Sequence, residues 1–197
     1  MSTSKVKDVM VRSALLRDVS PVLRLINDYA AQGLMLPRTE SELAENIRDF
    51  LVACSGDEIV GCGALHFYGP TSAEIRSLAV HPDFKGAGVG RQLVQALEAE
   101  ARRHGLRSIF AFTYVPGFFH KLGFTEVERG LLPSKVWKDC LRCPKFYCCD
   151  EIAMRKLLVP EETAVPVPAE PAEETVLLPV LKPLNGGRER AAGPENS

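Results

Sequence analysis

The 197-residue sequence lacks a long apolar run, an N-terminal apolar segment and a strong charge of either sign. No uninterrupted apolar stretch is long enough to cross a bilayer as a helix. Because no apolar region follows the polar N-terminal residues, a secretory signal peptide is not expected either. A formal net charge of −1 gives no reason to expect nucleic acid or an anionic membrane as the main partner.

What the sequence does contain is the balance of an ordinary globular domain. Hydrophobic residues make up 46% of the chain and charged residues 25%. The length suits one domain with a well-buried core. These features predict a cytoplasmic protein, in which the six cysteines stay reduced.

The composition divides the chain into three parts. Residues 1–8 are polar and are predicted to be flexible, whereas 9–159 carry the periodic patterns of a folded domain. From residue 160 the composition changes abruptly, and seven of the 14 prolines lie in the last 38 residues. Because such a segment buries too little apolar surface to offset its ordering entropy, 160–197 is predicted to be disordered. The apolar run at 176–181 leaves a short docking motif open as an alternative.

Within residues 9–159, strand patterns and helix patterns alternate without a strict repeat. The predicted strands are 9–12, 50–55, 59–67, 74–80, 108–113, 124–129 and 151–156. Helices are predicted after Ser20 as N-cap, after the capping box at 39–42, after the glycines at 86–90, and at 116–123. The sequence therefore predicts an α/β domain with a mixed, partly antiparallel central sheet flanked by helices.

The most informative segment is 81–91, in which three glycines separate a strand from an amphipathic helix. Gly86, Gly88 and Gly90 let the backbone approach a bulky anion and turn its N–H groups toward it. The following helix adds unpaired N–H groups and the positive end of its dipole. The segment lacks the Lys-Ser/Thr ending of a P-loop and the glycine spacing of a Rossmann turn. It predicts a phosphate site of another kind, with a flexible loop as the alternative.

The order of strand, His-Pro, basic residue, Gly-x-Gly-x-Gly and helix resembles the acetyl-CoA-binding motif of the GNAT superfamily of N-acetyltransferases. The resemblance implies the same mixed fold and acetyl-CoA as co-substrate. It implies that backbone groups of Leu78, Ala79 and Val80 bind the pantetheine arm and the acetyl carbonyl. The residues implied to bind the pyrophosphate are Lys85, Gly86, Ala87, Gly88, Val89, Gly90 and Arg91. Lys85 stands where the family has Arg or Gln.

Acetyl transfer to an amine needs a group that removes a proton and a group that protonates the leaving thiolate. Glu74 opens the strand that leads to the glycines and is the candidate general base, with a solvated carboxylate as the alternative. Many GNAT enzymes carry a tyrosine acid in a Phe-Tyr-x-x-x-Gly-Phe segment, but here Phe119 stands at that position and cannot donate. Thr113 and Tyr114, just upstream, are the candidate acids, and the thiolate can also leave unprotonated.

Three segments of the N-terminal half carry a closer resemblance. Residues 32–38, 45–50 and 61–65 together look like the acetyltransferase domain of bacterial N-acetylglutamate synthase, and further matches extend the similarity over about 10–137. The resemblance implies transfer to the α-amine of L-glutamate, the first step of arginine biosynthesis. The amino-acid-kinase-like domain of many such synthases has no counterpart in this sequence. We therefore expect a short, stand-alone form without arginine feedback through that domain.

A pocket for glutamate calls for guanidinium groups, because these bind carboxylates through paired hydrogen bonds. Arg38 matches an arginine of the family's substrate-side segment. Arg76 follows Glu74 by two residues and so points to the same sheet face. Lys135 is the third candidate for substrate binding. For each of them, a surface ion pair is the alternative interpretation.

The resemblance ends after Lys135. The family's Tyr-Asn and Arg-x-Ser-Lys patterns are replaced by a cysteine-rich segment, which contains Cys140, Cys143, Cys148 and Cys149. Their spacing resembles that of zinc ligands, but no second well-spaced pair or histidine completes the pattern. We therefore predict no metal, with reduced cysteines beside the substrate pocket, and keep a four-thiolate zinc site as the alternative.

The sequence thus predicts an amino-acid N-acetyltransferase that takes acetyl-CoA and L-glutamate and has no nucleic-acid or membrane partner. Two alternatives stay open. One is a GNAT enzyme that acetylates another small amine or a protein lysine. The other is a non-catalytic acyl-CoA-binding sensor, which the missing tyrosine at position 119 allows. Whether the chain forms a homodimer is also left open.

Overall fold

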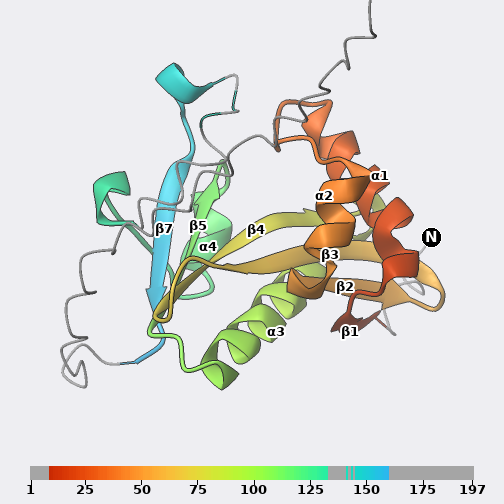
Figure 1. Ribbon diagram of the computed structural model, residues 1–197, viewed down its shortest axis with the longest axis horizontal. Coiled ribbons are helices and arrows are strands. Elements are labelled where there is room, and N and C mark those ends of the chain that lie inside the picture. The colour runs from red at the N-terminus through yellow and green to blue at the C-terminus, as the bar shows by residue number, and fades with distance from the viewer. Residues whose placement is uncertain (1–8, 133–140, 142, 144, 160–197) are drawn as a thin grey trace, which may run out of the picture. The chain divides into compact units, whose positions relative to one another are not determined.

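The computed structural model describes residues 9–132, 141, 143 and 145–159, and these contain a seven-stranded sheet with helices packed against it (Figure 1). The strands are β1 (Val9–Ser13), β2 (Phe50–Ser55), β3 (Glu58–Phe67), β4 (Ser72–Val80), β5 (Ser108–Thr113), β6 (Thr125–Glu126) and β7 (Ile152–Leu157). The helices are α1 (Val19–Ala30), α2 (Glu40–Glu45), α3 (Val89–Arg103) and α4 (Pro116–His120). No helix in these ranges is long and apolar enough to cross a membrane.

The strand order is β1-β2-β3-β4-β5-β7-β6, and each neighbouring pair is antiparallel except β4 and β5. This arrangement confirms the mixed, partly antiparallel sheet. The single parallel pairing is short, because only residues 72–74 of β4 pair with 108–110 of β5. Beyond these positions the two strands run apart (Figure 1). The sheet is therefore divided at its middle, with one edge of β4 turned toward the division.

Strand β2 is apolar along almost its whole length, and because successive side chains point to opposite faces of the sheet, it contributes to a core on each face. Leu51 and Ala53 belong to the cluster that packs against α3, whereas Val52 and Cys54 belong to the cluster under α1. Helices α1 and α2 contact each other over this second cluster (Figure 1). The residues of α3 predicted to face the core are all buried, and they are Val89, Leu93, Leu97 and Ala101.

A glycine of β3 lets α3 lie close to the sheet. A Cβ atom on Gly61 would lie 3.1 Å from Leu93 Cδ1, 3.1 Å from Val89 Cγ1 and 3.2 Å from the carbonyl oxygen of Ala79. Real Cβ atoms seldom come so close to their neighbours. The first turns of α3 are therefore seated at a distance from β3 that only glycine allows.

The start of α1 differs from its prediction. The N-cap is Asp18 rather than Ser20, because a 3₁₀ turn runs directly into the helix. The Asp18 carboxylate accepts hydrogen bonds from Arg12 Nη1 at 2.6 Å and from the backbone N–H of Leu15 at 2.8 Å. These contacts fix the turn before the helix, and the hydrogen bond from Arg12 holds the pKa of Asp18 below its usual value.

The strand expected through residue 129 is also shorter than predicted. Strand β6 covers only two residues, and a 3₁₀ turn occupies Arg129–Leu131. The other predicted strands agree with the structure to within two residues at each end. The predictions for 1–8 and 160–197 lie outside the described residues.

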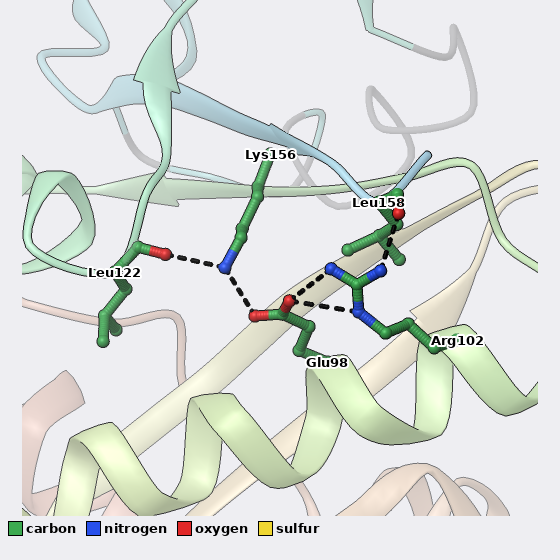
Figure 2. A network of polar contacts seen from close by, with 5 residues as sticks. All are labelled: Glu98, Arg102, Leu122, Lys156 and Leu158. Carbon is green, nitrogen blue, oxygen red and sulfur yellow. Dashed lines mark hydrogen bonds and ion pairs between the residues drawn. The ribbon is translucent and has the colours of Figure 1, made fainter. Parts of the chain in front are cut away.

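A polar network fastens the far half of α3 to β7 (Figure 2). Glu98 accepts from Lys156 Nζ at 2.7 Å and from Arg102 Nη2 at 2.8 Å. Lys156 also donates to the carbonyl oxygen of Leu122 at 2.8 Å, and Arg102 donates to that of Leu158 at 2.6 Å. Because Leu122 follows α4, the network joins α3, β7 and the turn after α4.

This network predicts a specific loss of stability in acid. Burial alone would raise the pKa of Glu98, but the hydrogen bonds from Lys156 and Arg102 outweigh it and lower the pKa below 4.5. A lowered carboxyl pKa contributes stability that is present above the unfolded-state value and is lost as pH falls through the folded-state value. In urea unfolding below pH 4.5, Glu98→Gln should therefore lose less stability than the wild type. Glu100→Gln, on the same helix but outside the network, is the control and should follow the wild type; parallel curves for Glu98→Gln would contradict the prediction.

Candidate active site

Strand β4 contains a bulge in the part that no longer pairs with β5. Pairing with β3 shifts between Cys62 and Ala64, so that Ser77 and Leu78 lie opposite the single residue Gly63. Ser77 has a φ of 51°, the only positive value among the non-glycine residues described. Bulges re-aim the residues that follow them, and such backbone strain is concentrated at functional sites. The predicted acetyl-binding residues 78–80 lie directly after this point.

The glycine segment forms an exposed turn at the start of α3. Gly86 and Gly88 have φ values of +79° and +85°, and nothing lies within 4 Å of a Cβ atom built on either. Gly88 is the N-cap of α3, and no side chain of the described residues caps it. Lys85 and Arg91, at the two ends of the turn, are both exposed. Helix N–H groups, left-handed glycines and two cations therefore meet here, as an anion site requires.

One tyrosine of α1 joins the two parts of the predicted acetyl-CoA site. This residue is Tyr29, and its hydroxyl donates a hydrogen bond to the carbonyl oxygen of Val80 at 2.6 Å. The ammonium of Lys85 lies 4.9 Å from the centre of the same ring, within the range of a cation–π contact. The end of β4 and the entrance of the glycine turn are thus held against α1.

Glu74 lies half-buried at the point where β4 and β5 separate. The hydroxyl of Tyr68 donates to its Oε2 atom at 3.1 Å. Across the β3–β4 ladder Glu74 pairs with His66, whose Nδ1 lies 2.7 Å from Asp49 Oδ2. Glu74 is therefore a held carboxylate on a polar face rather than a freely solvated one. Sequence reasoning did not single out Tyr68 or Asp49, although Asp49 lies within a segment that carries the resemblance.

The two predicted arginines are positioned in different ways. Arg76 lies before the bulge, so that it shares a sheet face with Glu74. Arg38 lies just before the cap of α2, where the side chain of Asn27 makes two hydrogen bonds to its backbone. Lys135, the third candidate, lies outside the described residues.

The two candidate acids follow one another at the end of β5. Thr113 is buried, and its Oγ1 accepts from the backbone N–H of Val115 at 3.0 Å, which leaves its own hydrogen to donate elsewhere. Tyr114 accepts from Lys145 Nζ at 3.2 Å, and Lys145 also lies 3.2 Å from Asp150. Burial raises the pKa of Tyr114 against the opposing effect of Lys145, so the phenol keeps its proton at neutral pH.

Phe119 is part of the apolar core. It is buried, and its ring lies 5.1 Å from that of Phe118 and 5.2 Å from that of Phe124 in edge-on contacts. The position where many GNAT enzymes carry a proton donor is thus filled by hydrocarbon in this chain.

Glu151 is an ionisable residue near the candidate acids that sequence reasoning missed. It precedes β7, whose first residue pairs with Thr113. Burial raises its pKa, while the positive charge of Arg129 opposes the shift. Cys149 Sγ lies 3.9 Å from its carboxylate. At a strand start, an isolated glutamate looks solvated in the sequence, and only the fold shows what covers it.

The cysteines give no metal centre in the part of the chain that is described. Among those residues no three His, Cys, Asp or Glu side chains are grouped as metal ligands would be. Cys143, Cys148 and Cys149 are free thiols, and Cys140 lies outside the described residues. Cys62 is fully buried, which raises its pKa to about 12 and leaves the thiol unreactive.

The comparison with protein-family models agrees with the predicted acetyl-CoA site. Residues 20–124 match the model of the acetyltransferase (GNAT) family, and the chain belongs to that family. It is an acetyl-CoA-dependent N-acetyltransferase.

Two relatives match this chain over about two thirds of its length or more. The chain is 44% identical over 151 residues to an uncharacterized N-acetyltransferase of Chlorobaculum tepidum, which covers 77% of this chain and 97% of that protein. It is 35% identical over 136 residues to the amino-acid acetyltransferase of Mycobacterium tuberculosis, which covers 68% of this chain and 78% of the relative.

Solved structures show the same fold with CoA bound. A Mycobacterium tuberculosis protein in complex with CoA matches with a TM-score of 0.66 and 31% identity, over 76% of this chain and 99% of the other. N-acetylglutamate synthase of Neisseria gonorrhoeae, complexed with coenzyme A and N-acetyl-glutamate, matches with a TM-score of 0.71 and 26% identity. That match covers 78% of this chain but only 36% of the synthase.

Proposed function

We propose that the enzyme transfers the acetyl group of acetyl-CoA to the α-amine of L-glutamate and so supplies N-acetylglutamate to arginine biosynthesis. The observation that carries this proposal is that Glu74, whose carboxylate accepts a hydrogen bond, and Arg76 lie on the same face of β4, where β5 diverges. An amine and a carboxylate of one small acceptor would find complementary groups there. The similarity to a synthase crystallised with N-acetyl-glutamate supports the same acceptor.

The donor follows the divided edge of the sheet. The pantetheine arm lies along residues 78–80, which follow the part of β4 that pairs with β5. The pyrophosphate lies in the turn from Lys85 to Arg91, at the N-terminus of α3. This arrangement brings the thioester to the end of β5, beside the two candidate acids.

The chemistry assigns one task to each group. Glu74 takes a proton from the glutamate ammonium, directly or through water, and the free amine attacks the thioester carbonyl carbon. The carbon–sulfur bond then breaks, and the thiolate takes a proton from Thr113 or Tyr114. The proton that the attacking nitrogen releases as the amide forms replaces the one given up by that residue, directly or through water. Arg38 and Arg76 bind the carboxylates of the acceptor, with Lys135 as a further candidate.

The pyrophosphate assignment makes a prediction for two glycines at opposite ends of α3. Gly88 and Gly105 both have positive φ, and both have open space where a Cβ would be. Gly88→Ala and Gly105→Ala should each lower stability by about 1 kcal/mol, because alanine is strained in this conformation. Only Gly88→Ala should raise the KM for acetyl-CoA, by roughly tenfold, because the helix N–H groups then turn away from the phosphate. Equal KM values for the two variants would show that the pyrophosphate does not bind in this turn.

A thiol-release assay across the amino acids and common amines tests the proposed acceptor. We expect turnover of acetyl-CoA with L-glutamate to exceed that with every other amine. Turnover should fall by about 100-fold in Arg38→Ala, since a carboxylate then loses a charge-assisted hydrogen-bonding partner. Preference for another amine, or unchanged activity of Arg38→Ala, would exclude glutamate as the acceptor. Acetyl-CoA binding without turnover for any amine would instead show the acyl-CoA sensor.

A further inference from the structure

Asn27 holds the backbone of Arg38 with both ends of its side-chain amide. Its Nδ2 donates to the carbonyl oxygen of Arg38 at 3.0 Å, and its Oδ1 accepts from the N–H of Arg38 at 3.0 Å. The amide therefore pairs with Arg38 as a neighbouring β-strand would. These bonds connect the third turn of α1 with the residue that leads into α2.

The next residue of the chain is fixed as well. Thr39 caps α2: its Oγ1 accepts from the N–H of Glu42 at 3.2 Å, and Glu42 Oε2 accepts from the N–H of Thr39 at 2.9 Å. Four side-chain-to-backbone hydrogen bonds thus define the backbone path through residues 38 and 39. The Arg38 side chain leaves a backbone that has little freedom to move.

The same stretch of α1 carries the contact to the donor side. Tyr29, two residues after Asn27, donates to the carbonyl oxygen of Val80 and lies under the ammonium of Lys85. The side chains of residues two apart on a helix are separated by about 200° around the helix axis, so this one turn of α1 contacts two different segments of the chain. One neighbour carries a predicted acceptor residue, and the other carries the predicted acetyl-CoA residues.

We propose that Asn27 and Tyr29, which we call the bracket, together set the acceptor specificity of the enzyme. Asn27 is the positioning residue for Arg38, and Tyr29 fixes the predicted acetyl-CoA residues. The proposal rests on the proposed function in that Arg38 binds an acceptor carboxylate. Asn27 contacts no substrate: it acts by holding the arginine at a set distance from the acetyl group. Asparagine is a poor helix former, and in this helix its amide is committed to a residue eleven positions away.

The test is a set of steady-state measurements on the full chain with both substrates varied. Asn27→Ala should raise the KM for glutamate roughly tenfold and leave the KM for acetyl-CoA unchanged, because a displaced Arg38 side chain weakens only the binding of the acceptor. Tyr29→Phe should do the opposite and raise the KM for acetyl-CoA a few-fold. The matched control is Gln32→Ala, which removes another amide near the end of the same helix, one that bonds to the Asp28 carbonyl. It should change neither KM.

A double-mutant cycle separates positioning from general stability. If Asn27 acts through Arg38, adding Asn27→Ala to Arg38→Ala should cause no further rise in the glutamate KM, because contacting residues are not additive. If the two effects multiply, or if Asn27→Ala raises both KM values together, the bracket is wrong. Asn27→Asp keeps the bond from the Arg38 N–H and loses the other, so its glutamate KM should lie between those of the wild type and Asn27→Ala. This second variant keeps the test open if Asn27→Ala fails to fold.

Failure of the proposed function has a different signature. If glutamate is not the acceptor, the wild-type enzyme itself shows no glutamate-dependent thiol release. If the bracket alone is wrong, the wild type is active and Arg38→Ala is impaired, while Asn27→Ala behaves as the Gln32→Ala control.

Discussion

Glu74→Gln is expected to lower kcat for glutamate acetylation by at least about 100-fold, the usual contribution of a positioned general base. Glutamine keeps the size of the side chain and can still accept the hydrogen bond from Tyr68. What it loses is the capacity to take the proton from the acceptor ammonium. Binding of acetyl-CoA, measured by titration, should remain as in the wild type.

The pH dependence of this variant distinguishes a base from a merely structural residue. As pH rises toward the pKa of the acceptor amine, more acceptor is free amine and less proton removal is needed. The deficit of Glu74→Gln should therefore shrink at high pH. Tyr68→Phe, which removes the hydrogen bond to Glu74 and leaves the carboxylate in place, is the control and should lose about tenfold or less. A constant deficit at all pH values would remove Glu74 as the base.

Gly61→Val should lower the free energy of unfolding by about 3 kcal/mol, near the upper range for overpacking a core. Its Cβ would meet Leu93, Val89 and the carbonyl oxygen of Ala79 at 3.1–3.2 Å, and the added methyl groups would need more room still. The helix must then lift from β3, which moves its N-terminus and raises the KM for acetyl-CoA. Urea denaturation and acetyl-CoA titration measure the two effects.

The control for this substitution is Gly117→Val. Gly117 has no atom within 4 Å of a built Cβ, and its φ is not positive. The same change of residue there should alter stability by less than about 1 kcal/mol. Equal stabilities for the two variants would mean that α3 is not seated on β3 as closely as the structure has it.

The regular part of the fold was predictable because its signals are local. The continuous apolar run of β2 and the turn residues after it marked both ends of the strand, and the residues of α3 predicted to face the core are all buried. Capping-box spacing at Thr39 likewise predicted the start of α2, where the two reciprocal hydrogen bonds are present. In each case the residues that decide the structure lie within a few positions of one another.

The features that were missed depend on contacts between different elements of the fold. Ser20 looked like the better cap for α1, but Arg12 on β1 binds Asp18 and moves the start of the helix. The bulge at Ser77 carries no sequence signal, because the positive φ belongs to serine rather than glycine. The partners of Glu74 and Arg38 come from other elements in the same way. The candidate residues themselves could be proposed from local sequence patterns, whereas the groups that hold them are visible only in the fold.

The short pairing of β4 with β5 also bears on how the protein resists unfolding. Among the described residues, only three residue pairs of β4 and β5 join the two halves of the sheet as paired strands, and the edge of β4 beyond them is not paired with β5. If acetyl-CoA lies along this edge, the co-substrate takes the structural part of a missing strand. We expect it to raise the melting temperature by mass action and to slow hydrogen exchange in both halves together. Cellular acetyl-CoA supply would then influence how long the enzyme survives as well as how fast it works.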